Sequence, residues 1–210
     1  MQATQARDVS LEELEQQFGL QLSTESKFFK ELQNSSPSTS DFERQYLKRV
    51  QQNYNNLSTR KSFSEEAVKM VVLSPLLDLA GLYRAPFSLR TEESIELISE
   101  DEGQSVKGKI DVLVVLQKLW ALVIESKSTQ FDVLFPLAQG LTYLLSASDS
   151  PEPIYGLLVN GREFVFLELI RQPTPTYARS FALAIERDDD LEKVLSILKA
   201  IKQKILVSQA

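Results

Sequence analysis

Residues 108–127 read GKIDVLVVLQKLWALVIESK, a stretch that contains two short apolar runs. The runs cover residues 110–116 and 120–124, are rich in Val, Leu and Ile, and are separated by the polar pair Gln117-Lys118. Short apolar runs of this composition on either side of a polar break predict two buried strands joined by a tight connection. We therefore expect a strand hairpin at the centre of the fold.

Each predicted strand carries an acidic residue, Asp111 near the start of the first and Glu125 at the end of the second. A hairpin centred on Lys118 places these two residues opposite each other, with their Cβ atoms roughly 5 Å apart. Two opposed like charges are destabilising unless a cation lies between them. Carboxylate oxygens are hard ligands, so the pair predicts Mg²⁺ or Mn²⁺, with Lys127 as a second positive group on the same face as Glu125.

The amino-acid composition restricts the catalytic mechanisms that the chain can use. The 210 residues suffice for one well-buried α/β domain with an extension, and they include no cysteine and no histidine. These absences exclude disulfides, thiol nucleophiles, Ser-His-Asp mechanisms and nearly all catalytic zinc sites. Acid–base chemistry must then come from carboxylates, Lys, Tyr or metal-bound water.

The net charge of −6 argues against strong nonspecific binding of nucleic acid by this chain alone. No apolar run reaches the length of a transmembrane helix, and the Gln-rich N-terminus lacks the apolar core of a signal peptide. We therefore expect a cytoplasmic protein.

Residues 1–60 are expected to form a polar, helical N-terminal extension, and residues 61–210 the main domain. A capping box at Ser10 predicts one short helix, residues 34–40 read as a linker, and Asp41 is expected to cap a second helix. The next predicted helix, from Ser64 to Gly81, contains Pro75, which requires either a kink or a new helix capped by Ser74.

Further along, we expect a strand over residues 92–99, a loop over 99–107 and a helix over 131–147 with Pro136 in its first turn. Asn160-Gly161 predicts a hairpin turn between strands at 153–160 and 163–170. A Pro-rich loop follows at 172–176, and three aspartates at 188–190 precede the last helix. The order predicts a mixed β-sheet flanked by helices.

The ordered set of Asp111, Glu125 and Lys127 resembles the motif of the PD-(D/E)XK nuclease superfamily. Gln139 and Tyr143, four residues apart on the next predicted helix, are similar to the QxxxY motif of RecB-like nucleases in that superfamily. The helix that begins near Glu65 resembles the opening helix of the N-terminal nuclease domain of type I restriction enzyme R subunits. The resemblance covers roughly residues 62–170 and implies a restriction-endonuclease-like fold.

The resemblance also implies roles. Asp111 and Glu125 would hold Mg²⁺, with the backbone carbonyl of Ser126 as a further ligand, and Lys127 would position the attacking water and offset phosphoryl charge. Gln139 would orient Lys127 or the nucleophile. Two more residues complete the implied set, namely Glu65 near the metal and Tyr143 positioning DNA or supporting Gln139.

The implied activity is metal-dependent hydrolysis of DNA phosphodiester bonds in a restriction or defence system. Type I R subunits carry an ATP-driven translocase after the nuclease domain, whereas this chain ends at Ala210 and contains no G-x-x-x-x-G-K-[ST] phosphate loop. We therefore expect either a nuclease domain that acts alone or a separate motor or specificity subunit.

Two other hypotheses remain open. One is a catalytically inactive nuclease-fold scaffold that binds a protein partner or nucleic acid, which the acidic composition favours. The other is a carboxylate-metal phosphoesterase that acts on nucleotides or RNA. Taken singly, Asp111 is also compatible with a solvated carboxylate at a strand edge, and Glu125 with Lys127 is compatible with an exposed ion pair that has no catalytic role. Glu66 is an alternative to Glu65 as the site residue, and either is also compatible with a role at the helix N-terminus alone.

Overall fold

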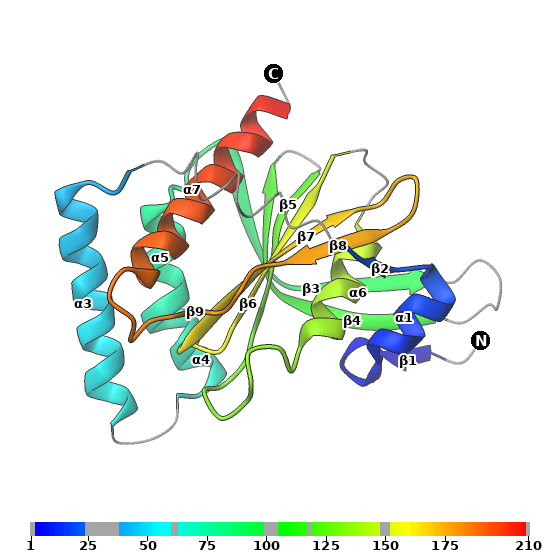
Figure 1. Ribbon diagram of the computed structural model, residues 1–210, viewed down its shortest axis with the longest axis horizontal. Coiled ribbons are helices and arrows are strands. Elements are labelled where there is room, and N and C mark those ends of the chain that lie inside the picture. Colours follow the sequence, from blue (N-terminus) through cyan, green and yellow to red (C-terminus); the bar gives the residue numbers. More distant parts are fainter. Residues whose placement is uncertain are drawn as a thin grey trace.

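The computed structural model describes residues 3–23, 38–59, 63–98, 105–116, 119–147 and 152–208. Within these ranges nine strands form one mixed sheet in the order β1-β4-β5-β6-β7-β8-β2, with β3 also paired to β4 and β9 to β7 (Figure 1). The strands are β1 (Ala3–Gln5), β2 (Gln21–Leu22), β3 (Phe87–Ile98), β4 (Ser105–Leu116), β5 (Leu119–Ser126), β6 (Ile154–Val159), β7 (Glu163–Ile170), β8 (Thr176–Arg179) and β9 (Leu183–Ala184).

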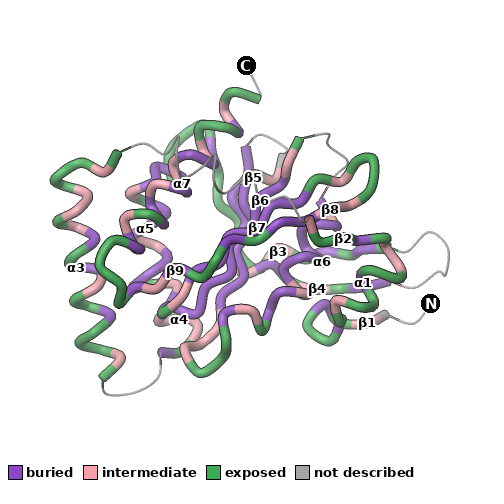
Figure 2. The backbone as a smooth tube through the Cα atoms, in the orientation of Figure 1, coloured by how far each residue is buried: buried purple, intermediate pink, exposed green. Residues whose placement is uncertain are grey.

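Helices cover both faces of this sheet. The helical segments are η1 (Ala6–Asp8), α1 (Leu11–Phe18), α3 (Asp41–Ser58), α4 (Glu65–Val68), η2 (Lys69–Leu73), α5 (Ser74–Leu79), α6 (Leu137–Ser146) and α7 (Asp190–Ser208). One apolar core lies between the sheet and α3, α4, α5 and α7, and a second lies between the sheet and α1 and α6. Figure 2 shows buried residues following the strands through the middle of the molecule. The expected mixed α/β sheet flanked by helices is confirmed.

The predicted central hairpin is present as β4 and β5. Their antiparallel register pairs Val112 with Ile124 and Val114 with Leu122, as a turn centred on Lys118 requires, and it shifts only beyond Val114. The turn residues 117–118 lie outside the described part of the chain. Because alternate residues enter the two cores over residues 112–116 and 122–124, these parts of the strands are buried on both faces.

The second predicted hairpin is confirmed in β6 and β7. Gly161 has a φ of 82°, a conformation that glycine adopts without steric cost, and Asn160 closes the turn. The Asn160 side-chain oxygen accepts hydrogen bonds from the backbone N–H groups of Arg162 at 3.0 Å and Glu163 at 2.7 Å. The last helix, α7, begins at Asp190, at the end of the predicted acidic start.

The N-terminal segment is joined to the sheet. Strand β1 pairs with β4, β2 pairs with β8, and α3 contributes to the first core. The capping box at Ser10 is confirmed, but Ser40 caps α3 in place of the expected Asp41, because Ser40 forms a capping box with Glu43. Residues 34–37 of the expected linker lie outside the described ranges, and the division at residue 60 stays a prediction.

The helix continues through Pro75. The residues from Glu65 to Leu79 remain helical, with a π-helical turn, η2, directly before α5. Leu73 is right-handed helical, so Ser74 does not start a separately capped helix as one of the two predictions had it. The wider turn accommodates a proline whose ring would clash with the preceding turn of a regular α-helix.

Other boundaries also differ from the prediction. Strand β3 begins at Phe87, five positions before the expected start at 92, and β4 begins at Ser105, inside the expected loop. Helix α6 begins only at Leu137 because residues 131–136 form turns. Thr176, expected in a loop, starts β8. Among the helices in the described ranges, none combines the length and the apolar composition that crossing a membrane requires.

Candidate active site

The site is assembled where the middle of β4, the end of β5 and the start of α4 meet. Asp111 comes from β4, Glu125 and Ser126 from the end of β5, and Glu65 from the first residue of α4. Lys127 directly follows β5 and its N–H donates to the carbonyl of Val159 at 2.9 Å, which continues the pairing with β6. Sheet pairing therefore holds the backbone of Glu125, Ser126 and Lys127, and the helix start holds that of Glu65.

The alternation of β4 is interrupted at Asp111. Ile110 packs in the second core and Val112 in the first, although residues two apart on a regular strand share a face. On the neighbouring strand Glu92 lies opposite this point with a φ of 54°, which is uncommon for a residue other than glycine. Departures of this kind concentrate at functional sites.

The predicted pairing of Asp111 with Glu125 lies one position beyond the last pair of the β4–β5 ladder, in the same register. The β4–β5 ladder ends at the pair Val112 and Ile124, and Asp111 instead reaches the residue after Glu125. Its Oδ2 atom accepts hydrogen bonds from the backbone N–H of Ser126 at 2.7 Å and from the Ser126 hydroxyl at 3.1 Å. The strand irregularity turns the carboxylate toward β5, so the two acids are neighbours without being a ladder pair.

Glu125 is a buried carboxylate with one unpaired oxygen. The residue is 1% exposed, its Oε1 atom accepts from Lys127 Nζ at 2.5 Å, and Oε2 is buried without a hydrogen-bond partner among the described residues. The predicted shared side of Glu125 and Lys127 is confirmed. Burial, followed by repulsion from Asp111, raises the pKa of Glu125 to about 8, although the Lys127 ammonium opposes this shift.

Lys69 is the site residue that the sequence reasoning missed. Its Nζ atom lies 3.0 Å from Asp111 Oδ1, 2.9 Å from Glu65 Oε1 and 4.0 Å from Glu92 Oε1. Burial alone would lower the pKa of Lys69, but the hydrogen bonds to Glu65 and Asp111 raise it well above its ordinary value. The four-residue spacing from Glu65 was a signal available in the sequence.

The structure separates Glu65 from its competitor Glu66. Ser64 caps α4 by accepting from Ala67 N at 3.2 Å, and this start directs Glu65 toward Lys69 and Asp111. Glu66 is exposed, and hydrogen bonds to its own backbone and to Ser64 lower its pKa. Glu65 therefore belongs to the site and Glu66 serves the helix start.

Gln139 and Tyr143 lie on the same side of α6, as predicted. The Gln139 amide donates to the Tyr143 hydroxyl at 2.6 Å, and that hydroxyl donates to the carbonyl of Lys109 at 2.8 Å. Tyr143 is 1% exposed and packs against Gly108 so closely that a Cβ there would lie 2.8 Å from its ring. This geometry favours a supporting role for Tyr143 over contact with DNA. Among the described interactions, Gln139 forms a hydrogen bond with Tyr143 and none with Lys127.

Asp111, Glu125 and Ser126 supply some, but not all, of the ligands that a hard divalent ion requires. No group of three Asp, Glu, His or Cys side chains that could hold a metal is found in the described ranges. Asp111, Glu125 and the Ser126 carbonyl nevertheless supply oxygen donors of the kind that Mg²⁺ and Mn²⁺ prefer, with water completing the shell. The unpaired Oε2 of Glu125 is the observation that favours an ion, because a buried carboxylate oxygen without a partner is costly.

A hollow of about 510 Å³ adjoins Asp111 and gives access to it. Its charged lining residues are Lys69, Glu92 and Asp111, and its apolar lining includes Met70 and Leu89.

No known protein family model matches the chain, and no curated protein matches it.

Proposed function

We propose that the chain is a Mg²⁺- or Mn²⁺-dependent nuclease that hydrolyses phosphodiester bonds in DNA. The observation that carries the proposal is the buried carboxylate of Glu125, which has an unpaired oxygen, lies beside Asp111 and binds Lys127. Structural carboxylates in protein interiors are normally satisfied by partners. A buried acid held incompletely paired next to a second acid is typical of a functional site.

The proposal gives each residue a role. Asp111, Glu125 and the Ser126 carbonyl would hold the ion, and the ion would supply a more acidic water molecule and charge stabilisation at the phosphate. Lys127, held by Glu125, places an ammonium group where charge would grow on the phosphoryl oxygens. Gln139 and Tyr143 fix α6 against β4 and so keep the strand that carries Asp111 in place.

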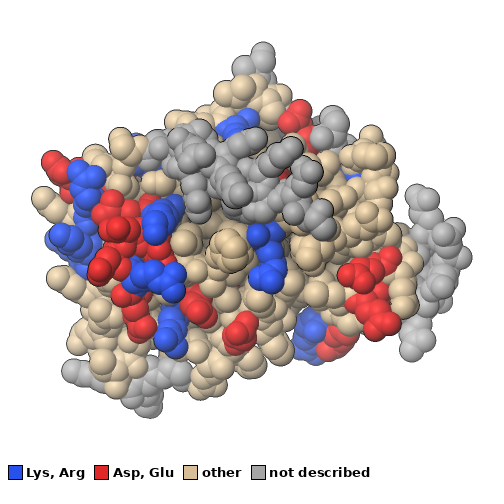
Figure 3. Space-filling model, in the orientation of Figure 1, with Lys and Arg blue, Asp and Glu red and all other residues tan. Residues whose placement is uncertain are grey.

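The substrate must reach this site against an overall charge of −6. On the face shown in Figure 3, basic and acidic side chains are intermixed over α3 and α7, and acidic side chains gather over α1. Such a surface attracts a polyanion weakly. We therefore include in the proposal a separate motor or specificity subunit of a restriction or defence system that brings DNA to the site.

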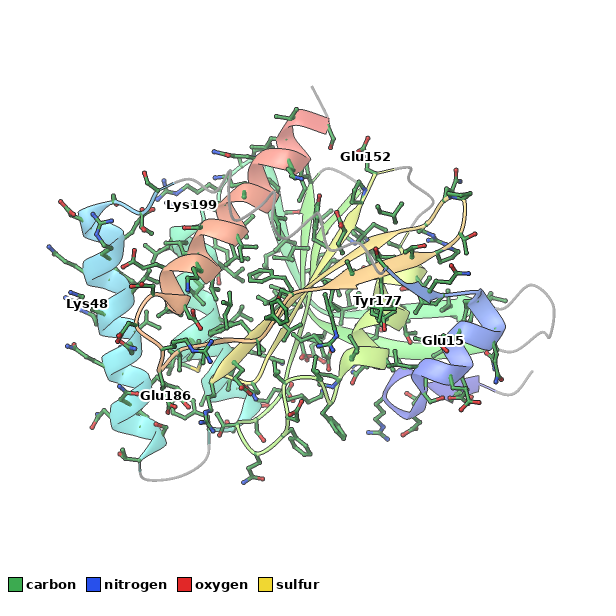
Figure 4. The ribbon with its side chains drawn as sticks, in the orientation of Figure 1. Glu15, Lys48, Glu152, Tyr177, Glu186 and Lys199 are labelled. Carbon is green, nitrogen blue, oxygen red and sulfur yellow. The ribbon has the colours of Figure 1, made fainter. Side chains whose placement is uncertain are left out.

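The test is incubation of the purified protein with supercoiled and linear DNA in the presence of Mg²⁺ or Mn²⁺. We expect nicking that is lost in EDTA and that falls at least about 100-fold in Lys127→Met and Asp111→Asn, since each removes charge from the reacting centre. Lys48→Met and Glu15→Gln are matched controls, because both residues lie on exposed helix surfaces (Figure 4). Cleavage that is unchanged by Lys127→Met would refute the proposal.

A second candidate is a nuclease-like scaffold without chemistry. It is favoured by the hydrogen bonds of Asp111, whose two carboxylate oxygens are already engaged by Lys69 and Ser126. Calorimetric titration with Mn²⁺ separates the two candidates. Binding that Asp111→Asn abolishes supports the nuclease, whereas no binding at millimolar concentration supports the scaffold.

A further inference from the structure

Three carboxylates from three different elements surround one ammonium group beside the candidate site. Lys69 contacts Glu65 of α4 and Asp111 of β4 at hydrogen-bonding distance, and Glu92 of β3 lies 4.0 Å away. The Lys69 side chain is 23% exposed, so this cation is partly withdrawn from water. A cation shared by three acids offsets their mutual repulsion.

The two acids of the site differ in what a cation would have to displace. Glu125 offers Oε2 without breaking any described hydrogen bond. Asp111 has no such oxygen, because Ser126 occupies Oδ2 and Lys69 occupies Oδ1. The Ser126 bond belongs to the strand backbone, so the Lys69 bond is the one that a side-chain movement can release.

We propose that Lys69 is a positioning residue that acts as a resident counter-cation: it holds Asp111 while no metal is bound and yields Asp111 Oδ1 to the divalent ion, retaining Glu65 and turning toward Glu92. This inference rests on the proposed metal-dependent function. It adds that metal binding is an exchange of cations, in which an ammonium group must leave before Asp111 can coordinate.

The surroundings of Lys69 allow this exchange. The hollow of about 510 Å³ is lined by Lys69, Glu92 and Asp111, so the ammonium can leave Asp111 without entering the packed core. The Glu92 side chain is 59% exposed, and its Oε1 atom lies 4.0 Å from Lys69 Nζ. Lys69 is also the first residue of the π-helical turn, a local departure from α-helix that is frequent at functional sites.

The test compares Mn²⁺ affinity in the native protein and in Lys69→Met by calorimetry. Met keeps the length and packing of the side chain but removes the competing ammonium, so we expect the dissociation constant to fall at least about tenfold. Lys69→Arg keeps a cation that can bind the Asp111 carboxylate and is expected to bring no such gain in affinity. Lys48→Met removes the same charge from an exposed position on α3 and is expected to have no effect (Figure 4).

A further measurement separates direct exchange from general electrostatics. The gain in Lys69→Met should persist in 0.5 M salt, which screens distant charges but not a direct contact. Equal affinity of the native protein and Lys69→Met would overturn the role of Lys69 while leaving the metal site intact. No Mn²⁺ binding in either protein would overturn the metal site itself, and a gain that high salt removes would also overturn the exchange.

A measurement on the unaltered protein covers the case in which Lys69→Met does not fold. Lysine side chains labelled with ¹³C at Cε report the surroundings of each ammonium group by nuclear magnetic resonance. Diamagnetic Mg²⁺ should shift the Lys69 signal in step with binding and leave the Lys48 signal unchanged. A Lys69 signal that stays constant while the protein saturates with Mg²⁺ would contradict the exchange.

Discussion

Glu125 and Asp190 are both buried carboxylates with 1% exposure, but they differ in their partners. Asp190, at the start of α7, accepts from Ala184 N at 3.0 Å and from Lys193 Nζ at 2.9 Å, and Arg187 lies 3.3 Å away. Burial would raise its pKa, but the hydrogen bonds from Lys193 and Ala184 lower it. Glu125 has one ion pair and one unpaired oxygen, and its pKa is raised to about 8.

The comparison shows that burial alone does not distinguish a structural acid from a functional one. Asp190 is surrounded by donors and joins β9 to the start of α7, so its charge contributes to folding. Glu125 lies beside another acid and retains an unused acceptor, which contributes nothing to folding and is available to a ligand. The distinction yields predictions for both residues.

The largest expected effect is on cleavage. Glu125→Gln should lower the rate of DNA nicking by about 100-fold or more, because the neutral amide is a far weaker ligand for a hard divalent ion. Asp190→Asn should leave the rate of the folded protein within about threefold, since Asp190 holds a helix start. Plasmid nicking normalised to the folded fraction measures both rates. Similar losses of rate in the two variants would show that Glu125 and Asp190 do not differ in function.

The next effect is on stability. Asp190→Ala removes the acceptor for Ala184 N and the partner of Lys193, and we expect it to lower the free energy of unfolding by about 2 kcal/mol. Urea denaturation followed by circular dichroism measures this loss. A change below about 0.5 kcal/mol would show that the buried charge of Asp190 is not structural.

A third prediction concerns pH. The pKa of Glu125 is raised from 4.5 to about 8, so the folded protein retains a proton that the unfolded chain has released between these values. Stability without divalent ions should therefore decline as pH rises from 4.5 to 8, and Glu125→Gln should remove this decline. The difference in free energy of unfolding between Glu125→Gln and the native protein should shift in favour of the variant by on the order of 2 kcal/mol as pH rises from 5 to 8.5.

Urea denaturation at both pH values in EDTA tests this prediction. The contribution of Asp190 to stability should depend on pH in the opposite direction, because its lowered pKa means that this contribution is lost as pH falls. If Glu125→Gln loses stability at pH 8.5 relative to the native protein, Glu125 is charged and well paired, like Asp190.

The smallest expected effect concerns the support of the site. Tyr143→Phe removes the hydroxyl that joins Gln139 to the carbonyl of Lys109, and we expect a loss of about 1 kcal/mol in stability. Metal affinity should change less than threefold, because Tyr143 holds a helix against β4 without touching the ion. A loss of metal binding with unchanged stability would place Tyr143 in the site itself.

The sequence predicted the parts of the fold that depend on local pattern. The β4–β5 and β6–β7 hairpins followed from apolar runs and turn residues, and the alternation of side chains along a strand placed Glu125 and Lys127 on one side. The Ser10 capping box and the start of α7 likewise depend on residues close together in the chain. Residues close together in the chain specify these features.

The parts that were missed depend on contacts between distant residues. The short strands β1 and β2 exist only because β4 and β8 pair with them, so their composition carries little signal. The turn of Asp111 toward Ser126 arises from a strand irregularity opposite Glu92, which periodicity cannot show. Lys69 enters the site from a π-helical turn that changes which residues face the sheet.

Anomalous scattering at the manganese absorption edge, recorded from a crystal of the protein soaked in Mn²⁺, shows whether Asp111 and Glu125 hold an ion. We expect an anomalous peak within about 2.3 Å of a carboxylate oxygen of both Asp111 and Glu125, with Lys69 Nζ moved away from Asp111. A crystal soaked at a saturating Mn²⁺ concentration that shows no peak between those carboxylates, with Lys69 still bound to Asp111, would refute the proposed metal site.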